Sequence, residues 1–213
     1  MSDIISQTIS LYSQTDNSEV KVTLAPSPVG EGVGGEALIL DGAMGTMIQR
    51  FHLTEDDFRG EMFKDWPVRL QGNNELISLT RPDVLRQIHR EYLEAGADII
   101  TANTFSAQRI SQADYQTEDY VVEMNRAALQ IAREEAERMT QLTPNKPRYV
   151  VATIGPTNRT LSMSPDVENP AYRALTFDQL CEAYEEQMMV LSEGGVDLFM
   201  LETIFDTLNA KAG

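Results

Sequence analysis

Cysteine, histidine and basic residues are scarce in this sequence. Its 213 residues include one cysteine, Cys181, and two histidines; 17 Lys and Arg stand against 33 Asp and Glu, for a formal net charge of −16. One cysteine excludes an intramolecular disulfide, so a reducing, cytoplasmic location is expected. The excess of acidic residues argues against nucleic-acid binding, because phosphates need a basic surface, and against binding to an anionic membrane.

Long apolar runs are also missing. None approaches the roughly 18 residues that a membrane-spanning helix needs, and the opening "MSDIISQTIS" has neither the basic region nor the apolar core of a secretory signal. The composition, 42% hydrophobic and 23% charged, is typical of a globular protein.

The first 36 residues differ from the rest. They are rich in Ser, Pro and Gly, as in "APSPVGEGVGGE", and show little apolar periodicity. We expect a flexible N-terminal extension over 1–36, with a short strand in "VKVTL", and one domain over 37–213.

Four short apolar runs in the larger part predict strands. They are "ALIL" (37–40), "ADIITA" (97–102), "YVVATI" (149–154) and "VDLFML" (196–201). Their apolarity is continuous rather than alternating, which favours parallel strands covered on both faces.

Amphipathic helices are expected between these strands, within 81–98, 117–139 and 176–195, and a fourth begins near 205. The alternation predicts an α/β fold, either an open doubly wound sheet or the first half, about four βα units, of a (βα)8 TIM-type barrel. The connection 51–81 is long, and we expect it to be a lid held by Phe63 and Trp66.

Polar residues follow the strands. The first strand is followed by Asp41 and Gly42, the second by Asn103 and Thr104, and the fourth by Glu202. Parallel α/β sheets bind ligands at the carboxyl ends of their strands. Asp41 and Glu202 could hold one ammonium group, and backbone N–H groups after Asp41 could hold a carboxylate, which together describe an amino-acid site. The alternative is that Asp41 only caps a turn.

Several other kinds of site are disfavoured. "DGAMG" lacks the spacing of a dinucleotide fingerprint. One cysteine and two histidines are too few for a zinc site; Cys181 and His89 fall on helix stripes and read as structural. A phosphate site is disfavoured because only Arg159 follows a strand closely.

Five long stretches carry a family resemblance. They are "LDGAMGTMIQ", "LQGNNELISLTRPDVL", "IHREYLEAGADIITANTFSA", "ATIGPTNRTLSMSPDVENPAYRALTFDQL" and "GGVDLFMLETIFDTLNAKA". From about Ala37 onward the chain resembles the N-terminal homocysteine-binding module of cobalamin-dependent methionine synthase. The first 36 residues do not share the resemblance.

The resemblance implies a (βα)8 barrel in which homocysteine binds zinc as a thiolate and takes a methyl group from methylcobalamin. The cofactor is then recharged by methyltetrahydrofolate, so the implied partners are pterin-binding and cobalamin-binding modules. It also implies that Asp41, Gly42 and Glu202 fix the amino-acid end of homocysteine, with Asn103 and Thr104 at the same mouth.

One departure concerns the metal. The family's zinc cysteines follow its sixth and eighth strands, beyond the four strands visible here. We therefore expect neither zinc nor cobalamin on this chain and no methyl transfer by it alone, since the thiolate is the nucleophile. Open sheet edges predict self-association. Two alternatives remain: a homocysteine S-methyltransferase that uses betaine or S-methylmethionine, and a non-catalytic amino-acid-binding module.

Overall fold

The computed structural model describes residues 8–12, 19–23 and 38–213, and the chain divides into two units, 1–37 and 38–213. In the first unit, β1 (Thr8–Tyr12) pairs antiparallel with β2 (Glu19–Thr23). The short strand expected in "VKVTL" corresponds to β2, whereas β1 was not expected. The predicted flexibility of 1–36 concerns residues that lie largely outside the described ones and stays a prediction.

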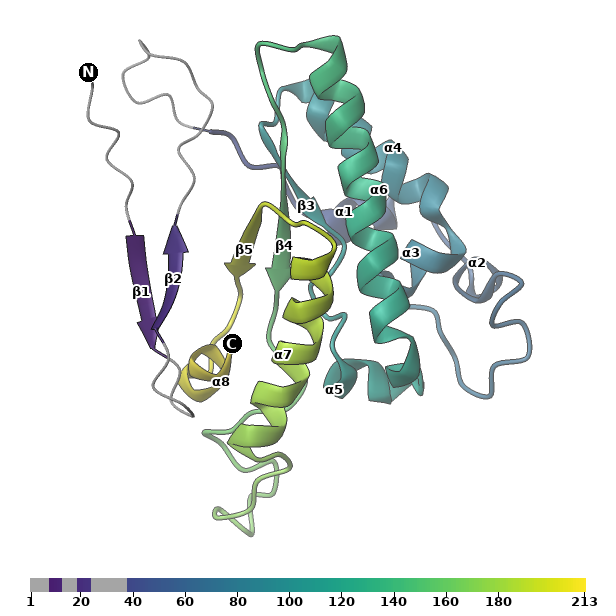
Figure 1. Ribbon diagram of the computed structural model, residues 1–213. Helices are drawn as coiled ribbons and strands as arrows, with labels where there is room; N and C mark the ends of the chain where they lie inside the picture. Colours follow the sequence, from purple (N-terminus) through teal and green to yellow (C-terminus); the bar gives the residue numbers. More distant parts are fainter. Residues whose placement is uncertain (1–7, 13–18, 24–37) are drawn as a thin grey trace. The chain divides into compact units, whose positions relative to one another are not determined.

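The second unit has a parallel sheet in the order β3-β4-β5, formed by Ile99–Ala102, Tyr149–Ile154 and Leu198–Leu201 (Figure 1). Ile99 is opposite Tyr149, and Val151 is opposite Leu198. The prediction of an α/β fold with parallel strands is confirmed. The central strand β4 is buried from Val150 to Ile154, as expected of a strand covered on both faces, but β5 is largely exposed.

The first expected strand, 37–40, is not a regular strand in the described residues. Only Leu40 forms a bridge, a parallel one with Ile99, although the Ile39 carbonyl accepts from the backbone N–H groups of Asp98 (2.8 Å) and Ile99 (3.1 Å). The Ile39 N–H itself donates to the Asp98 carboxylate at 2.8 Å. A side chain thus takes the place of a backbone acceptor and interrupts the ladder, so the count of four strands is not confirmed.

An aspartate precedes both β3 and β5 in the same way. Asp98 follows Gly96, and Asp197 follows Gly195; both glycines have a left-handed backbone, with φ of 113° and 77°. The Asp197 carboxylate accepts the Val150 N–H at 2.7 Å, as Asp98 accepts that of Ile39. This repeated arrangement, which we call the Gly-x-Asp bridge, ties the start of each strand to its predecessor.

Helices follow the strands in chain order. The long ones are α4 (Pro82–Ala95), α6 (Val121–Leu142) and α7 (Phe177–Glu193), and the shorter ones are α1 (Met44–Gln49), α2 (Glu55–Arg59), α3 (Ile77–Thr80), α5 (Arg109–Gln112) and α8 (Thr207–Ala212), with 3-10 turns η1 (Asn74–Leu76), η2 (Ala113–Tyr115) and η3 (Glu118–Tyr120). All four predicted helices are therefore present. In the described residues, no helix is both long and apolar enough to cross a membrane.

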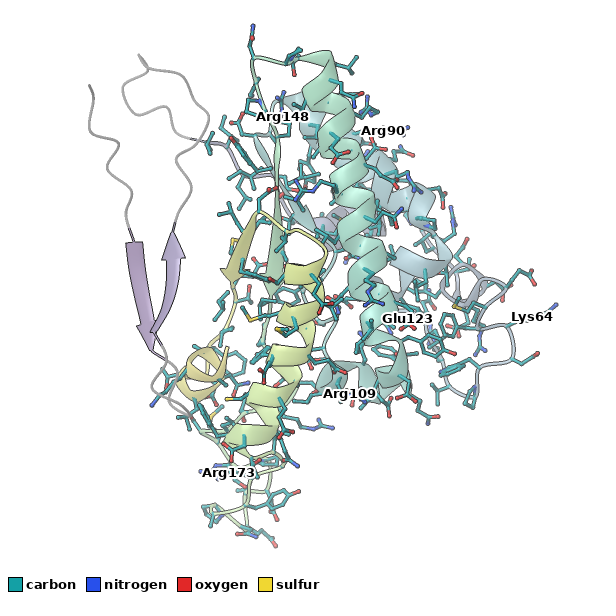
Figure 2. The ribbon with its side chains drawn as sticks, in the orientation of Figure 1. Lys64, Arg90, Arg109, Glu123, Arg148 and Arg173 are labelled. Atoms are coloured by element: carbon teal, nitrogen blue, oxygen red, sulfur yellow. The ribbon has the colours of Figure 1, made fainter. Side chains whose placement is uncertain are left out.

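The long helices pack in chain order, α4 on α6 and α6 on α7, and the short α8 packs on α7 (Figure 1). Arg90, which Figure 2 shows beside α6, makes a bidentate pair with Glu135, both N–O distances being 2.8 Å. The predicted stripes largely hold: Leu85, Ile88 and Leu93 are buried. Phe177, an apolar residue at the start of α7, is by contrast 37% exposed.

The connection 51–81 belongs to the core around α4 and α6. Phe63 is buried, and its ring centroid lies 5.3 Å from that of Trp66 and 4.9 Å from that of Tyr120. Phe63 and Trp66, the two expected anchors, therefore pack in a core that includes residues of α4 and α6. Lys64, which lies between the two anchors in the sequence, extends into solvent (Figure 2). The expectation that the stretch is a lid stays a prediction.

Both outer members of the sheet expose apolar side chains. These are Leu38, Ile39 and Leu40 on one side, each at least 40% exposed, and Leu198, Phe199 and Leu201 of β5 on the other, each at least 37% exposed. The expected self-association remains a prediction, and these six residues are where it would occur.

Candidate functional site

A cavity of about 540 Å³ opens where the strands end. Its walls come from the segment after the first apolar run, from the exit of β3, from η1 and from the end of β5. All five residues proposed from the sequence line it: Asp41, Gly42, Asn103, Thr104 and Glu202. The exit of β4 does not contribute in the same way, because only Thr153 of that strand reaches the wall.

Asp41 is held by a neighbouring strand. Its Oδ2 accepts the backbone N–H of Thr101 at 2.8 Å, and its Oδ1 accepts the Thr101 hydroxyl at 2.6 Å. Burial raises the pKa of the Asp41 carboxyl, the two bonds from Thr101 oppose that rise, and the charge of Glu202 adds to it. Asp41 therefore ties the segment after the first apolar run to β3, and its carboxyl is affected by the charge of Glu202.

Glu202 follows β5 directly, and its backbone N–H donates to the Ile154 carbonyl at 3.2 Å. Burial raises the pKa of its carboxyl. The next residue, Thr203, has φ of 58°, a left-handed conformation that a β-branched residue rarely adopts. Backbone strain of this kind is concentrated at functional sites, and here it accompanies the turn that places Glu202 in the cavity wall.

Asn103 and Thr104 also line the cavity, but their side-chain donors have partners within the protein. The Asn103 amide donates to the Asn74 carbonyl at 2.7 Å. The Thr104 hydroxyl donates to the Thr153 carbonyl at 2.9 Å and accepts the Thr153 N–H at 3.1 Å. These two side chains thus fix the shape of the wall.

Gly42 is required by close packing. A Cβ at this position would lie 2.9 Å from the hydroxyl of Tyr92, which itself donates to the Ala43 carbonyl at 3.2 Å. Helix α1 begins at Met44, two residues after Gly42.

Sequence reasoning missed Glu75. This residue lies in η1, is 8% exposed and lines the cavity. Burial raises the pKa of its carboxyl, and its Oε1 accepts the Ser106 N–H at 3.1 Å. An acid at the head of the apolar run "ELISL" was the available signal.

The cavity is therefore acidic. It presents the carboxyl groups of Asp41, Glu75 and Glu202, and none of the described residues that line it is Lys, Arg or His. A ligand that carries a positive charge would compensate these carboxylates, of which Glu75 is buried and the other two are half-buried, whereas an anion would be repelled.

The residues present do not fit zinc. Among the described residues, no three His, Cys, Asp or Glu side chains lie close enough to hold a metal ion. Cys181 is half-buried on α7 and does not line the cavity, and burial raises the pKa of its thiol, with nearby acids adding to the effect. No step through a metal follows from these residues.

Comparison with known proteins identifies the family of the chain. The model of the homocysteine S-methyltransferase family matches residues 38–213. The fold is similar to crystal structures of the homocysteine methyltransferase MmuM from Escherichia coli: the metallated form has a TM-score of 0.62 at 18% identity, and the oxidized form 0.61 at 19%.

The match is partial in length. It covers 83% of this chain and 57% of the metallated MmuM chain, and 82% and 56% for the oxidized form. At 18–19% sequence identity the similarity to these structures establishes the fold alone. The match to the family model over residues 38–213 establishes the family. The chain belongs to the homocysteine S-methyltransferase family.

Proposed function

We propose that this chain binds the amino-acid end of homocysteine in a methyltransferase that makes methionine, and that it forms the first half of a (βα)8 barrel. The observation that carries the proposal is that Asp41 and Glu202 line one cavity whose described lining has no basic residue. The charge of Glu202 also adds to the raised pKa of Asp41. Two carboxylates can hold the ammonium group of an amino acid, and charge-assisted hydrogen bonds are the stronger kind.

The remaining contacts would orient the substrate. Gly42 and Gly45 let the backbone approach the ligand closely, so N–H groups of this segment could take the substrate carboxylate. Asn103 and Thr104 would shape the cavity rather than bind the substrate directly, because their side chains already donate hydrogen bonds to the carbonyls of Asn74 and Thr153.

Homocysteine titration by calorimetry tests the proposal. Glu202→Gln should weaken binding about tenfold to a hundredfold, because a hydrogen bond to a charged group is worth about 1.5–3 kcal/mol. Glu185→Gln, an exposed position on α7, is the matched control. A second control is on the ligand side: 4-mercaptobutanoate lacks the ammonium group and should bind the wild type and Glu202→Gln equally weakly.

The result that contradicts the proposal is equal loss of homocysteine and 4-mercaptobutanoate on Glu202→Gln, or no loss of either. Acidification supplies an independent check. Because the pKa values of Asp41 and Glu202 are raised, both carboxyl groups take up a proton at a pH above their ordinary pKa values of 3.8 and 4.5. Homocysteine affinity should therefore begin to fall at a higher pH than ordinary carboxyl groups would give.

Two methyl donors are candidates. The long collinear stretches shared with cobalamin-dependent methionine synthase support methylcobalamin, recharged by methyltetrahydrofolate on a neighbouring module. The acidic cavity supports a small cationic donor, such as betaine or S-methylmethionine. Equilibrium dialysis of the chain against S-methylmethionine and against betaine tests the cationic candidates, since this chain alone is not expected to bind cobalamin. Binding of either compound that depends on homocysteine would support a cationic donor, and binding of neither would favour methylcobalamin.

A further inference from the structure

The part of the cavity wall that follows β3 is a tight turn. The Ala107 N–H donates to the Thr104 carbonyl at 3.1 Å and closes residues 104–107, which we call the wall turn. Thr104 and Phe105 of this turn line the cavity, and the Phe105 carbonyl accepts the Gly155 N–H at 3.0 Å. The position of the wall turn therefore sets the position of this side of the cavity.

Two amide side chains from neighbouring helices hold the two ends of the wall turn. Gln187 of α7 donates from Nε2 to the Thr104 carbonyl at 2.6 Å, and Asn125 of α6 donates from Nδ2 to the Ala107 carbonyl at 2.7 Å. Gln187 Nε2 also donates to Asn125 Oδ1 at 3.3 Å. Because α6 packs on α7 (Figure 1), the two side chains form one connected unit, which we call the amide pair.

Backbone carbonyls fix the orientation of both amides. Asn125 Nδ2 also donates to the Val121 carbonyl at 2.6 Å, so its nitrogen serves two backbone carbonyls and its Oδ1 is left to accept from Gln187. The two groups that Gln187 contacts are likewise oxygen acceptors, so its nitrogen has to face them. The amide pair therefore has one hydrogen-bonded arrangement, and that arrangement includes both ends of the wall turn.

Burial argues that Gln187 is not present for packing. Gln187 is 1% exposed and Asn125 is fully buried, and in the described structure Gln187 Oε1 has no hydrogen-bond partner. An unpaired polar atom in the interior costs free energy. An apolar side chain of similar volume, such as methionine, would fill the space without that cost. What a glutamine adds at this position is its two donated hydrogen bonds.

We propose that Gln187 and Asn125 are positioning residues that hold the wall turn from outside the cavity and thereby keep the cavity in the shape that binds its ligand. Neither residue is among those that line the cavity, so their effect on a ligand acts through the turn. The effect on homocysteine rests on the proposed function, whereas the hold on the wall turn does not.

Gln187→Met tests the positioning role, because it keeps the length of the side chain and removes both donated hydrogen bonds. Homocysteine affinity, measured by calorimetry, should fall about threefold to tenfold, which corresponds to the loss of one neutral hydrogen bond. Val190→Ala is the matched control, since Val190 is a buried apolar residue of the same helix. It should lower Tm through lost packing and leave homocysteine affinity unchanged.

Hydrogen exchange followed by NMR needs no ligand. In Gln187→Met the amides of Ala107 and Gly155, which bond to carbonyls of the wall turn, should exchange faster than in the wild type. Amides in the middle of α7 should keep their rates. Asn125→Leu should give the same pattern, and the double variant should lose less homocysteine affinity than the two single losses combined, because the two amides act as one unit.

The outcomes separate the two proposals. Equal exchange rates at Ala107 and Gly155 in wild type and Gln187→Met would overturn the hold on the wall turn. Faster exchange with unchanged homocysteine affinity would overturn the positioning role, and so would an affinity loss in Val190→Ala that matches its loss in Tm as closely as in Gln187→Met. A wild type that does not bind homocysteine would contradict the proposed function, while the exchange rates would still decide the role of the amide pair.

Discussion

Asp41 places both of its carboxylate oxygens on Thr101, one on the backbone N–H at 2.8 Å and one on the hydroxyl at 2.6 Å. The acid proposed to bind the substrate is thus also a cross-strand tie. The two roles are compatible, because each carboxylate oxygen can accept more than one hydrogen bond.

Thr101→Val removes the hydroxyl and keeps the shape of the side chain. The free energy of unfolding should fall by about 1 kcal/mol, a value reduced for partial exposure. The pKa of Asp41 should rise further, because the lost bond favours its ionised form. Urea denaturation and NMR titration measure the two effects. Thr46→Val, at an exposed position in α1, is the control, and an equal effect at both positions would contradict the prediction.

Thr203→Asn tests the strain at the cavity mouth. Asparagine tolerates the left-handed backbone better than a β-branched residue, so the variant should be more stable by about 1 kcal/mol, a shift of roughly 2–4 °C in Tm. Differential scanning calorimetry checks this, with Thr46→Asn as control. A Tm below that of the wild type would mean that the Thr203 side chain stabilises the fold by more than the backbone strain destabilises it.

Gly155→Ala should disturb the contact between two loops. The new Cβ would lie 2.6 Å from the Phe105 carbonyl oxygen and 2.8 Å from its ring, so backbone must move. We expect a loss of about 1–3 kcal/mol in unfolding free energy. Gly45→Ala in α1 has only the Asn74 side chain nearby, at 3.8 Å, and should be neutral or stabilising. Chemical denaturation of the two variants compares them directly.

His89 predicts a loss of stability in acid. It is fully buried, neither ring nitrogen has a hydrogen-bond partner in the described structure, and burial lowers its pKa to about 4, opposed by the charge of Glu135. Between pH 6.5 and about 4 the unfolded chain binds a proton that the folded chain does not. The stability that the folded state gains from keeping His89 neutral is fully present above pH 6.5. The free energy of unfolding falls by roughly 3 kcal/mol as the pH drops to 4.

Denaturation midpoints of His89→Leu across this pH range provide the measurement. The variant should lose the part of the pH dependence that His89 causes. His52→Asn is the matched control, since His52 is exposed and has a left-handed backbone that asparagine accepts. The same pH dependence in wild type and His89→Leu would exclude His89 as the source.

Much of the fold could be predicted because its signals are local. The stripes of α4 and α6 follow from a 3.6-residue period, and the aliphatic run of β4 matches its observed bounds. The irregular first strand could not be predicted from its own residues, because the interruption comes from the carboxylate of Asp98, 59 positions away from Ile39.

The candidate site shows the same division. Asp41 and Glu202 could be placed together because parallel strands bring their carboxyl ends to one edge. Glu75 could not, since η1 lies in a long connection whose path is set by tertiary contacts, such as the Asn103 bond to Asn74 and the Ser106 bond to Glu75. No periodicity specifies such a path.

The Gly-x-Asp bridges lie at the amino ends of β3 and β5, and the cavity lies at the opposite ends. Strand alignment is thus secured by aspartates that take no part in ligand recognition. Substrate preference could consequently change through the loops beyond Ala102 and Leu201 while the alignment of the sheet is conserved, which gives this fold freedom to diversify its chemistry.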